Sequence, residues 1–265
     1  MNRRWKGAAA ALVTALTLTF PALGAEVVVN GSTLPSHQAW VEDGTSYITL
    51  RAFAAHTPYE LSWDGRQAHL SGAGLELTAR SGDLYITANG RALYVPNGVR
   101  VVEGRLTLPL RVLAQATGSE LRWDGTAAAA RLGSTAAQPP SATYNVEDLY
   151  WLSRVISAES RGEPLLGQIA VGNVVLNRVK SREFPNTVKS VVFDTKNGVQ
   201  FEPTSNGTIY APPTDSAVLA AKLCLEGADV VGDCLYFYAP ALSSGRWIVN
   251  NRTYHITIGC HKFYR

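Results

Sequence analysis

The sequence is poor in the residues that bind metals and cross-link domains. Among its 265 residues there are only three cysteines and five histidines, and no cluster of them has the spacing of a zinc or other metal site. A basic tract is also missing, which removes the electrostatic footprint of a nucleic-acid-binding protein. These absences predict a protein with no metal, no other cofactor and no nucleic-acid partner.

The net charge of +3 comes from the start of the chain. Three basic residues among the first six precede an apolar run over residues 8–20, and small residues follow, which is typical of a secretory signal peptide over residues 1–25. An uncleaved anchor is the alternative, although the run is short for a membrane span of about 20 residues. Cleavage would remove three of 24 basic residues and none of the 21 acidic ones, which leaves a neutral chain. We therefore expect a secreted protein that has no membrane contact after cleavage.

The mature chain suits two modest domains, because a hydrophobic content of 46% is ample for buried cores. Ser, Thr, Ala, Gln and Pro crowd together without hydrophobic periodicity between residues 133 and 145, as in a linker. The prediction is a first module over residues 26–132, a linker over residues 133–145 and a second domain over residues 146–265.

The first module contains an internal duplication with an offset of 60 residues. Residues 60–65 read Glu, Leu, Ser, Trp, Asp, Gly, and residues 120–125 read Glu, Leu, Arg, Trp, Asp, Gly. In each copy a short strand leads to a helix that contains Leu and Arg, expected over residues 50–56 and 110–117, and then to a strand that ends at the Trp. We expect two related small α+β units packed together.

The repeated helix and the Trp-Asp-Gly turn resemble the copper amine oxidase N-terminal-like domain, a module common on secreted bacterial wall proteins. The resemblance implies attachment or the docking of a protein partner. It does not imply copper, because His37, His56 and His69 are scattered. Trp63 and Trp123 are interpreted as buried plugs beside a turn, with exposed glycan-stacking aromatics as the alternative.

The second domain is expected to be mainly helical, with a small sheet at its end. Three helices are predicted, over residues 146–159, 165–179 and 215–226. Three strand-like stretches follow, over residues 235–238, 247–250 and 254–258. Glu159 ends the first helix, and Gly162 and Pro164 break the chain before the second. The whole chain is therefore assigned to the α+β class.

A long ordered signature runs through this domain. It includes Ala-Glu-Ser-Arg-Gly-Glu-Pro at residues 158–164, Gly-Gln-Ile-Ala-Val at residues 167–171 and Asn-Arg-Val at residues 177–179. The signature resembles the SleB-type cell wall hydrolase domain of the spore cortex-lytic family, over nearly all of residues 148–264. The resemblance implies a lysozyme-like fold and cleavage of peptidoglycan glycan, in ordinary wall or spore cortex. The usual reaction is that of a lytic transglycosylase with one glutamate as general acid and base.

Glu159 matches that glutamate and is the candidate catalytic residue. Partial burial by apolar neighbours should raise its pKa, as glycosidase acids require. The acid protonates the glycosidic oxygen while substituents of the muramic residue trap the anomeric carbon, so a second carboxylate is not obligatory. The candidates for substrate binding are Glu163, Asn173, Asn177, Gln200, Phe201, Tyr236, Tyr238 and His261.

Several of these candidates have a structural alternative. Glu163 could simply favour the dipole at the N-terminus of the second helix, or it could orient substrate or Arg161. Asn173 and Asn177 could bind acetamido groups or bond to neighbouring loop backbone. Tyr236 and Tyr238 should share one face of a strand, of which one face is core.

Three other functions compete with glycan cleavage. A zinc amidase would cut the bond to the stem peptide, but it needs several ligands and this domain offers only His255 and His261. A peptidase would need Cys260 and His261 to face one another, which neighbours on a strand rarely do. A noncatalytic scaffold would retain the fold, bind the wall and present the duplicated module to another protein.

The three cysteines all lie in the second domain. One disulfide with one free thiol is the simplest interpretation of an exported domain, with Cys234 and Cys260 as candidate partners of one another. Three buried small hydrophobic side chains are the alternative.

Overall fold

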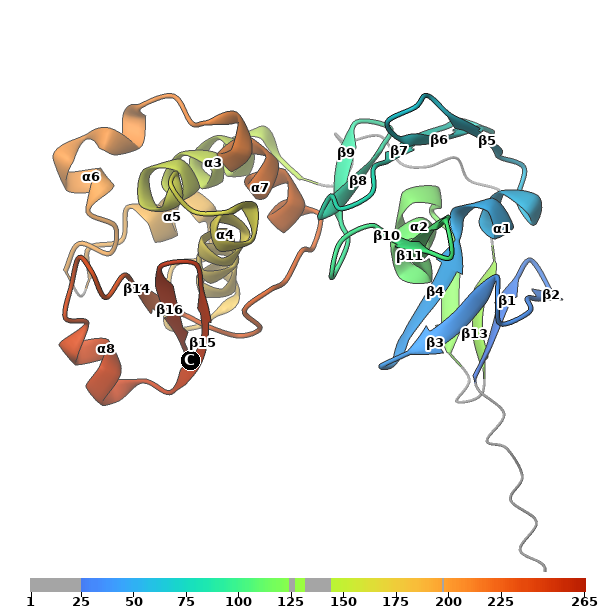
Figure 1. Cartoon of the computed structure of the whole chain (residues 1–265). Coiled ribbons are helices and arrows are strands. Elements are labelled where there is room, and N and C mark those ends of the chain that lie inside the picture. The colour runs from blue at the N-terminus through green and yellow to red at the C-terminus, as the bar shows by residue number, and fades with distance from the viewer. Residues whose placement is uncertain (1–24, 124–126, 132–143, 197) are drawn as a thin grey trace, which may run out of the picture.

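A computed structural model describes residues 25–123, 127–131, 144–196 and 198–265 (Figure 1). Apart from Ala25, Tyr144 and Asn145, the predicted signal peptide and linker lie outside these residues. Within the described ranges, no helix is both long enough and apolar enough to cross a membrane.

The duplicated module consists of two corresponding sets of elements separated by one inserted strand. The first set is β1 Glu26–Val29, β2 Ser32–Thr33, β3 Ala39–Glu42, β4 Thr45–Thr49, α1 Leu50–Ala55, β5 Glu60–Trp63 and β6 Ala68–Gly72. The inserted strand is β7 Leu75–Ala79. The second set is β8 Tyr85–Ala88, β9 Arg91–Tyr94, β10 Arg100–Val102, β11 Arg105–Pro109, α2 Leu110–Thr117, β12 Glu120–Trp123 and β13 Ala127–Arg131. The predicted helices and the strands that end at Trp are therefore present in both copies.

The two copies are interleaved around a pseudo-two-fold axis. Strands β4 and β11 pair antiparallel, and Ile48 lies opposite Leu108, its own counterpart at an offset of 60 residues. They form the centre of a sheet ordered β10-β11-β4-β3. The other two sheets, ordered β12-β13-β1-β2 and β5-β6-β7-β8-β9, also combine strands from both copies. Neither copy completes its sheets alone, so the module folds as one unit (Figure 1).

Asn-Gly pairs form tight turns in both copies. Asn30 and Gly31 have φ values of 49° and 81°, and Asn89 and Gly90 have φ values of 49° and 79°. Positive φ at both central residues is the requirement of a two-residue type I′ hairpin. The same turn chemistry thus starts both copies.

The prediction that Trp63 and Trp123 are buried plugs is wrong. Their side chains are 58% and 56% exposed. Both residues end strands that lie at the edges of their sheets, β5 and β12, where little covers the outer face. The core is filled instead by Ile48, Phe53 and Leu108, which are fully buried.

The C-terminal domain is built on three helices, α3 Val146–Ser160, α4 Leu165–Lys180 and α7 Asp215–Leu225, which pack against one another. The oxygens of Asn145 and Thr214 cap α3 and α7 by accepting bonds from backbone N–H groups. The remaining elements are α5 Val188–Val192, α6 Pro203–Asn206, the 3-10 turn η2 Thr208–Tyr210, β14 Tyr236–Tyr238, α8 Arg246–Asn251, β15 Tyr254–Ile258 and β16 His261–Tyr264.

The predicted strand over residues 247–250 is wrong, because this stretch lies in the helix α8. Gly245, with φ of 55°, turns the chain into that helix. The third strand of the sheet, ordered β14-β16-β15, is β16 at the end of the chain. A run of three apolar residues, Trp247 to Val249, does not distinguish helix from strand. The predicted α+β class, with a mainly helical C-terminal domain and a small antiparallel sheet, is confirmed.

A buried ion pair joins the two domains. Arg91 at the start of β9 lies 2.7 Å from Glu226 at the end of α7, and both side chains are buried. Gln115 of α2 also donates to the backbone carbonyl of Glu226 over 2.8 Å. The helix α7 therefore packs on the catalytic-domain core with one face and meets the N-terminal module at its end (Figure 1).

Candidate active site

Glu159 lies in the last turn of α3, where the sequence ends the helix abruptly. The hydroxyl of Ser160 donates back to the carbonyl of Ile156 over 2.7 Å, and Pro164 stands before α4. The carboxyl group is thus held at the C-terminal end of a helix, where the helix dipole disfavours negative charge. Its position favours the protonated acid.

Burial and two neighbouring charges set the pKa of Glu159. Burial, the largest cause, and the negative charge of Glu202 raise the pKa of its carboxyl group, the positive charge of Arg178 lowers it, and together they bring it from 4.5 to about 7. Within the described residues, the carboxyl group has no hydrogen bond or ion pair. At neutral pH the acid and its conjugate base are therefore both well populated, as a group that first gives and then takes a proton requires.

Arg178 supplies the positive charge near this carboxyl group. It extends from α4, is buried, and donates from Nε to the carbonyl of Leu235 over 2.8 Å. Its guanidinium carbon lies 4.8 Å from the ring centre of Phe184 and 5.2 Å from that of Phe201. Burial lowers the pKa of Arg178 to about 10, so the group is still protonated at neutral pH.

Arg178 and Glu202 were missed as site residues in the sequence. A signal for Arg178 was available, because it continues the apolar spacing of Val171 and Val174 along one face of α4, where an arginine is out of place. Glu202 is an exposed residue just before α6, and no local pattern places its charge near Glu159. Only the tertiary fold brings it there.

Three of the predicted substrate-binding residues have structural roles. Asn173 is buried, donates to the carbonyl of Ala228 over 2.6 Å and accepts from the N–H of Val230. Asn177 donates to two carbonyls of the same loop, those of Gly232 and Cys234. The loop-bonding alternative therefore describes both asparagines.

Phe201, the third, is 2% exposed and packs in the core, so its prediction as a glycan-stacking ring is wrong. Gln200, its neighbour, accepts from Nη1 of Arg178 over 3.4 Å and is half-buried. Gln200 therefore lies beside the charge that faces Glu159.

The strand β14 places its aromatic residues as the alternation predicts. Phe237 packs against Phe201 and Phe263 in the core, while Tyr236 and Tyr238 lie on the opposite face. The hydroxyl of Tyr236 accepts from Arg252 over 2.7 Å, and this ring is buried. Tyr238 is half-buried beside Tyr264. Tyr238 is the more accessible of the two candidates.

Glu163 joins the turn between α3 and α4 to the turn between β15 and β16. Its Oε2 accepts from the N–H of Cys260 over 2.9 Å, and its Oε1 lies 3.7 Å from Nδ1 of the buried His261. Within the described part of the chain, no hydrogen bond or ion pair joins it to Arg161. A side chain at Gly259, where φ is 58°, would collide with the Glu163 carboxylate. Glu163 and His261 therefore position the turn between β15 and β16.

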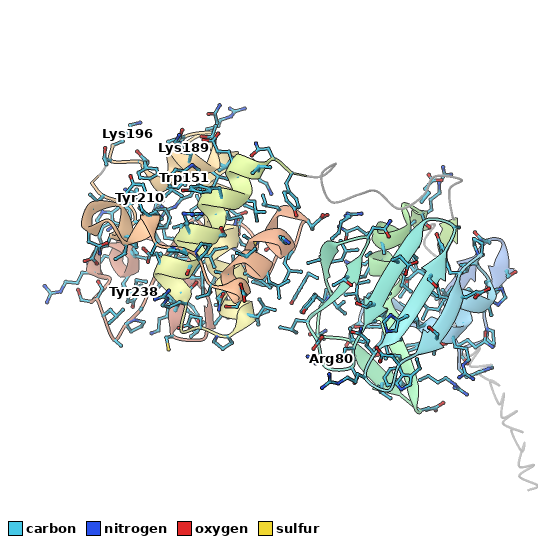
Figure 2. All side chains as sticks on the ribbon, turned by 90° about the horizontal axis from the view of Figure 1, so that it is seen from above. Arg80, Trp151, Lys189, Lys196, Tyr210 and Tyr238 are labelled. Atoms are coloured by element: carbon cyan, nitrogen blue, oxygen red, sulfur yellow. The ribbon has the colours of Figure 1, made fainter. Side chains whose placement is uncertain are left out.

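An aromatic surface that was not predicted lies on the helix that carries Glu159. Trp151 of α3 makes edge contacts with Phe193 and with the exposed Tyr210, at ring-centre distances of 4.9 and 6.2 Å. Figure 2 shows Trp151, Tyr210 and Lys189 together on one side of the domain, away from Tyr238. This surface therefore combines aromatic rings with a basic side chain.

The three cysteines are unpaired, so the predicted disulfide is wrong. Cys224 and Cys234 are buried and Cys260 is exposed. Burial raises the pKa of the Cys234 thiol to about 11, so it stays protonated. The alternative of buried small hydrophobic side chains fits two of the three. Among the described residues, no group of three or more His, Cys, Asp or Glu side chains is arranged to hold a metal ion.

Comparison with known proteins identifies both domains. The profile described as Cell Wall Hydrolase matches residues 162–264, and that described as Copper amine oxidase N-terminal domain matches residues 28–131. The cell wall hydrolase CwlJ of Oceanobacillus iheyensis is 30% identical over 103 residues, which are 37% of this chain and 72% of that protein. The chain belongs to the cell wall hydrolase family. Both predicted resemblances are confirmed.

This cell wall hydrolase is also similar to longer proteins. The spore cortex-lytic enzyme of Bacillus cereus is 39% identical over 105 residues, 40% of this chain and 39% of that protein. That of Bacillus subtilis is 34% identical over 122 residues, 46% of this chain and 39% of that protein. The chain therefore spans only 39% of the length of each of these relatives.

Among solved structures, the catalytic domain of the germination-specific lytic transglycosylase SleB from Bacillus anthracis is 38% identical. The match covers 46% of this chain and 97% of that one, with a TM-score of 0.43. Glu159 lies just before the residues that the family profile matches, so its role depends on the geometry described above.

Proposed function

We propose that this protein cleaves the glycan strands of peptidoglycan, with Glu159 as the one general acid and base. The observation that carries the proposal is the carboxyl group itself. It is partly buried at a helix C-terminus, lies in the field of Glu202 and Arg178, and has a pKa of about 7. An acid of this kind is what glycosidic bond cleavage requires near neutral pH.

The reaction that fits one carboxyl group is the lytic transglycosylase reaction. Protonated Glu159 gives its proton to the glycosidic oxygen as the bond from that oxygen to the anomeric carbon of the muramic residue breaks. The resulting carboxylate accepts the proton of the muramic C6 hydroxyl, whose oxygen forms the new bond to the anomeric carbon. The product carries a 1,6-anhydro ring, and Glu159 returns to its protonated state.

Arg178 has a positioning role in this scheme. Its charge stabilises the carboxylate that Glu159 becomes after it gives up its proton, and the pairing with Leu235 and Gln200 holds the guanidinium in place. Because Arg178 lowers the pKa of Glu159 while burial raises it, the acid is kept near neutrality rather than at a higher value.

Glu202 supports a second candidate, hydrolysis by water. It is an exposed carboxylate whose charge acts on Glu159, and two carboxyl groups on either side of a sugar can activate a water molecule against the anomeric carbon. Hydrolysis gives reducing ends instead of anhydro ends, so the products distinguish the two.

The relatives named spore cortex-lytic enzymes and the structure named a germination-specific lytic transglycosylase support spore cortex as the substrate and the spore envelope as the place of action. A predicted signal peptide supports export to the cell wall.

The proposal is tested by wall lysis with a matched binding measurement. Glu159→Gln keeps the size of the side chain and removes the proton that can be transferred. The variant should fail to clear suspensions of purified cortex peptidoglycan while it still sediments with that peptidoglycan as the wild type does. Lysis by this variant at the wild-type rate would show that Glu159 is not the acid. Binding without lysis by the wild type would support the scaffold alternative.

A further inference from the structure

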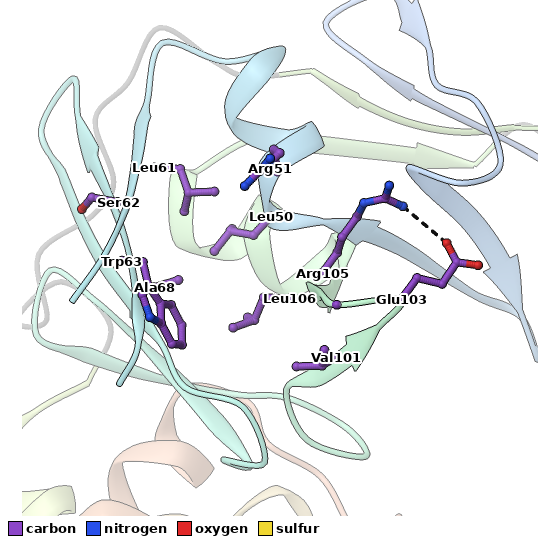
Figure 3. A pocket seen from close by; sticks show the side chains of 11 residues that line it. Leu50, Arg51, Leu61, Ser62, Trp63, Ala68, Val101, Glu103, Arg105 and Leu106 are labelled. Atoms are coloured by element: carbon purple, nitrogen blue, oxygen red, sulfur yellow. Dashed lines mark hydrogen bonds and ion pairs between the residues drawn. The ribbon is translucent and has the colours of Figure 1, made fainter. Parts of the chain in front are cut away.

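A hollow of about 700 Å³ opens on the N-terminal module, in the domain that does not contain Glu159 (Figure 3). Its walls come from both copies of the duplication: α1, β5 and β6 of the first copy, and the β10–β11 hairpin of the second. The hollow therefore exists only because the copies interleave. Its size lies within the usual range for sites that bind small molecules, about 300 to 1,000 Å³.

One wall of the hollow is aromatic and apolar. Figure 3 shows Trp63 and Leu61 of β5 on one side of the opening and Leu106 and Val101 on the other. Trp63 is 58% exposed and Val101 is 52% exposed, although burial of such side chains is favourable. An exposed indole over an apolar floor matches the flat, weakly polar face of a sugar ring.

The other wall is basic. Arg51 is exposed, and no hydrogen bond or ion pair of its side chain is found in the described part of the chain. Among the described residues, the side chain of Arg105 makes only long hydrogen bonds, at 3.4 Å, to Glu103 and to the carbonyl of His37. The lining of the hollow thus includes two arginines and one carboxylate, that of Glu103, and guanidinium donors suit the bidentate binding of carboxylates.

The basic wall also continues beyond the hollow. Arg51 and Arg105 line a second hollow of about 340 Å³ with His37 and His56, and Arg105 lines a third of about 130 Å³ with His37 and Trp40. Arg105 lines all three hollows, so they adjoin one another, and we refer to them together as the groove. Trp63 lies in the first hollow, and the arginines lie between it and the other two. An extended ligand with a ring at one end and carboxylates further along fits this arrangement.

We propose that this groove binds an acidic muropeptide, with a sugar ring on Trp63 and the carboxylates of the stem peptide at Arg51 and Arg105. The choice of ligand rests on the proposed function, because it takes the ligand from the same polymer that Glu159 cleaves. The groove would hold the enzyme on the wall through a second contact, which raises the local concentration of substrate. A protein partner would bury a broader surface, about 800 Å² on each side.

The duplication supplies a matched control. Trp123 is the counterpart of Trp63 and is equally exposed, and Arg111 is the counterpart of Arg51. However, Thr45 stands where Arg105 stands in the first groove. The arrangement of one indole with two arginines therefore occurs at Trp63 and not at its counterpart Trp123, and the proposal assigns the muropeptide to the groove at Trp63.

The experiment is isothermal titration of the full chain carrying Glu159→Gln, which prevents turnover, with a purified disaccharide tetrapeptide. Trp63→Ala should weaken a binding component about tenfold or more, as the loss of a tryptophan anchor does at other binding sites. The double substitution R51Q and R105Q should weaken the same component, whereas Trp123→Ala should leave it unchanged. Chitotetraose, which has no carboxylate, should bind more weakly and should not respond to the loss of the arginines.

The proposal would be overturned if the Trp63→Ala variant bound the disaccharide tetrapeptide as tightly as the chain with the unsubstituted groove. It would also be overturned if Trp63→Ala and Trp123→Ala weakened this binding equally. If the groove binds a protein partner instead, Trp63→Ala should leave the affinity for the disaccharide tetrapeptide unchanged. The failure of the proposed function is visible separately, because it appears as the absence of glycan cleavage by the chain with intact Glu159. Circular dichroism of each variant checks that a loss of binding is not a loss of fold.

Discussion

The burial that raises the pKa of Glu159 should also make the folded protein less stable when Glu159 is ionised. Its pKa is raised from 4.5 to about 7 in the folded protein, so the native state binds the proton more tightly than the unfolded chain. The stability that this proton contributes is fully present below pH 4.5 and is lost as the pH rises to about 7. Glu159→Gln replaces the ionisable group with a neutral one of the same shape and should remove this loss.

The magnitude follows from the shift. One pKa unit corresponds to about 1.4 kcal/mol, so the rise from 4.5 to about 7 corresponds to about 3 kcal/mol. Glu159→Gln should therefore raise the free energy of unfolding by up to about 3 kcal/mol at pH 8 and by almost nothing at pH 4. The catalytically dead variant is expected to be the more stable protein.

The assay is urea denaturation followed by tryptophan fluorescence, for wild type and Glu159→Gln, at intervals from pH 4 to pH 8.5. Glu183→Gln, on an exposed carboxylate of the same domain, is the control and should show no comparable rise with pH. A stability difference between wild type and Glu159→Gln that is the same at pH 4 and pH 8 would refute the argument, because the pKa of Glu159 would then be unshifted.

Three further predictions concern the same contacts. Glu202→Gln removes a negative charge that raises the pKa of Glu159, so the lysis rate should begin to decline at a lower pH than in the wild type. The pH-rate profiles of both proteins measure this, and an unchanged profile would contradict the electrostatic coupling of Glu202 to Glu159. Glu226→Gln leaves Arg91 buried without its charged partner and should lower the free energy of unfolding by about 3 kcal/mol in urea, whereas Glu120→Gln in an exposed pair should change it little. Gly259→Ala should lower the free energy of unfolding by at least about 1 kcal/mol, because of the positive φ at this position and the collision with the Glu163 carboxylate. Adding Glu163→Ala to this variant should recover part of the lost stability, and no recovery would mean that φ alone is responsible.

The parts of the fold that depend on local sequence were predictable. The helix α2 begins and ends where the sequence places it, since its apolar spacing and the Gly118 that follows are local signals. The Asn-Gly turns at residues 30 and 89 are local in the same sense. The interleaving of the copies was not predictable, because it depends on which distant strands pair, and the exposure of Trp63 follows from that pairing.

The site was predictable only in its chemical centre. The motif around Glu159 indicated the acid, and burial then raised its pKa as expected. Asn173 and Phe201 were assigned to substrate because amides and aromatic rings suit glycans, but the fold uses them inside the domain. Whether such a side chain faces solvent or a loop is decided by tertiary packing, which residue type and spacing do not contain.

Mass spectrometry of the fragments released from purified spore cortex tests the central claim most directly. The wild-type protein should release glycan fragments with 1,6-anhydromuramyl ends, and Glu159→Gln should release none. Anhydro ends released at the wild-type rate by Glu159→Gln, or free stem peptides with intact glycan strands from the wild type, would contradict the assignment of Glu159 as the acid and base of glycan cleavage.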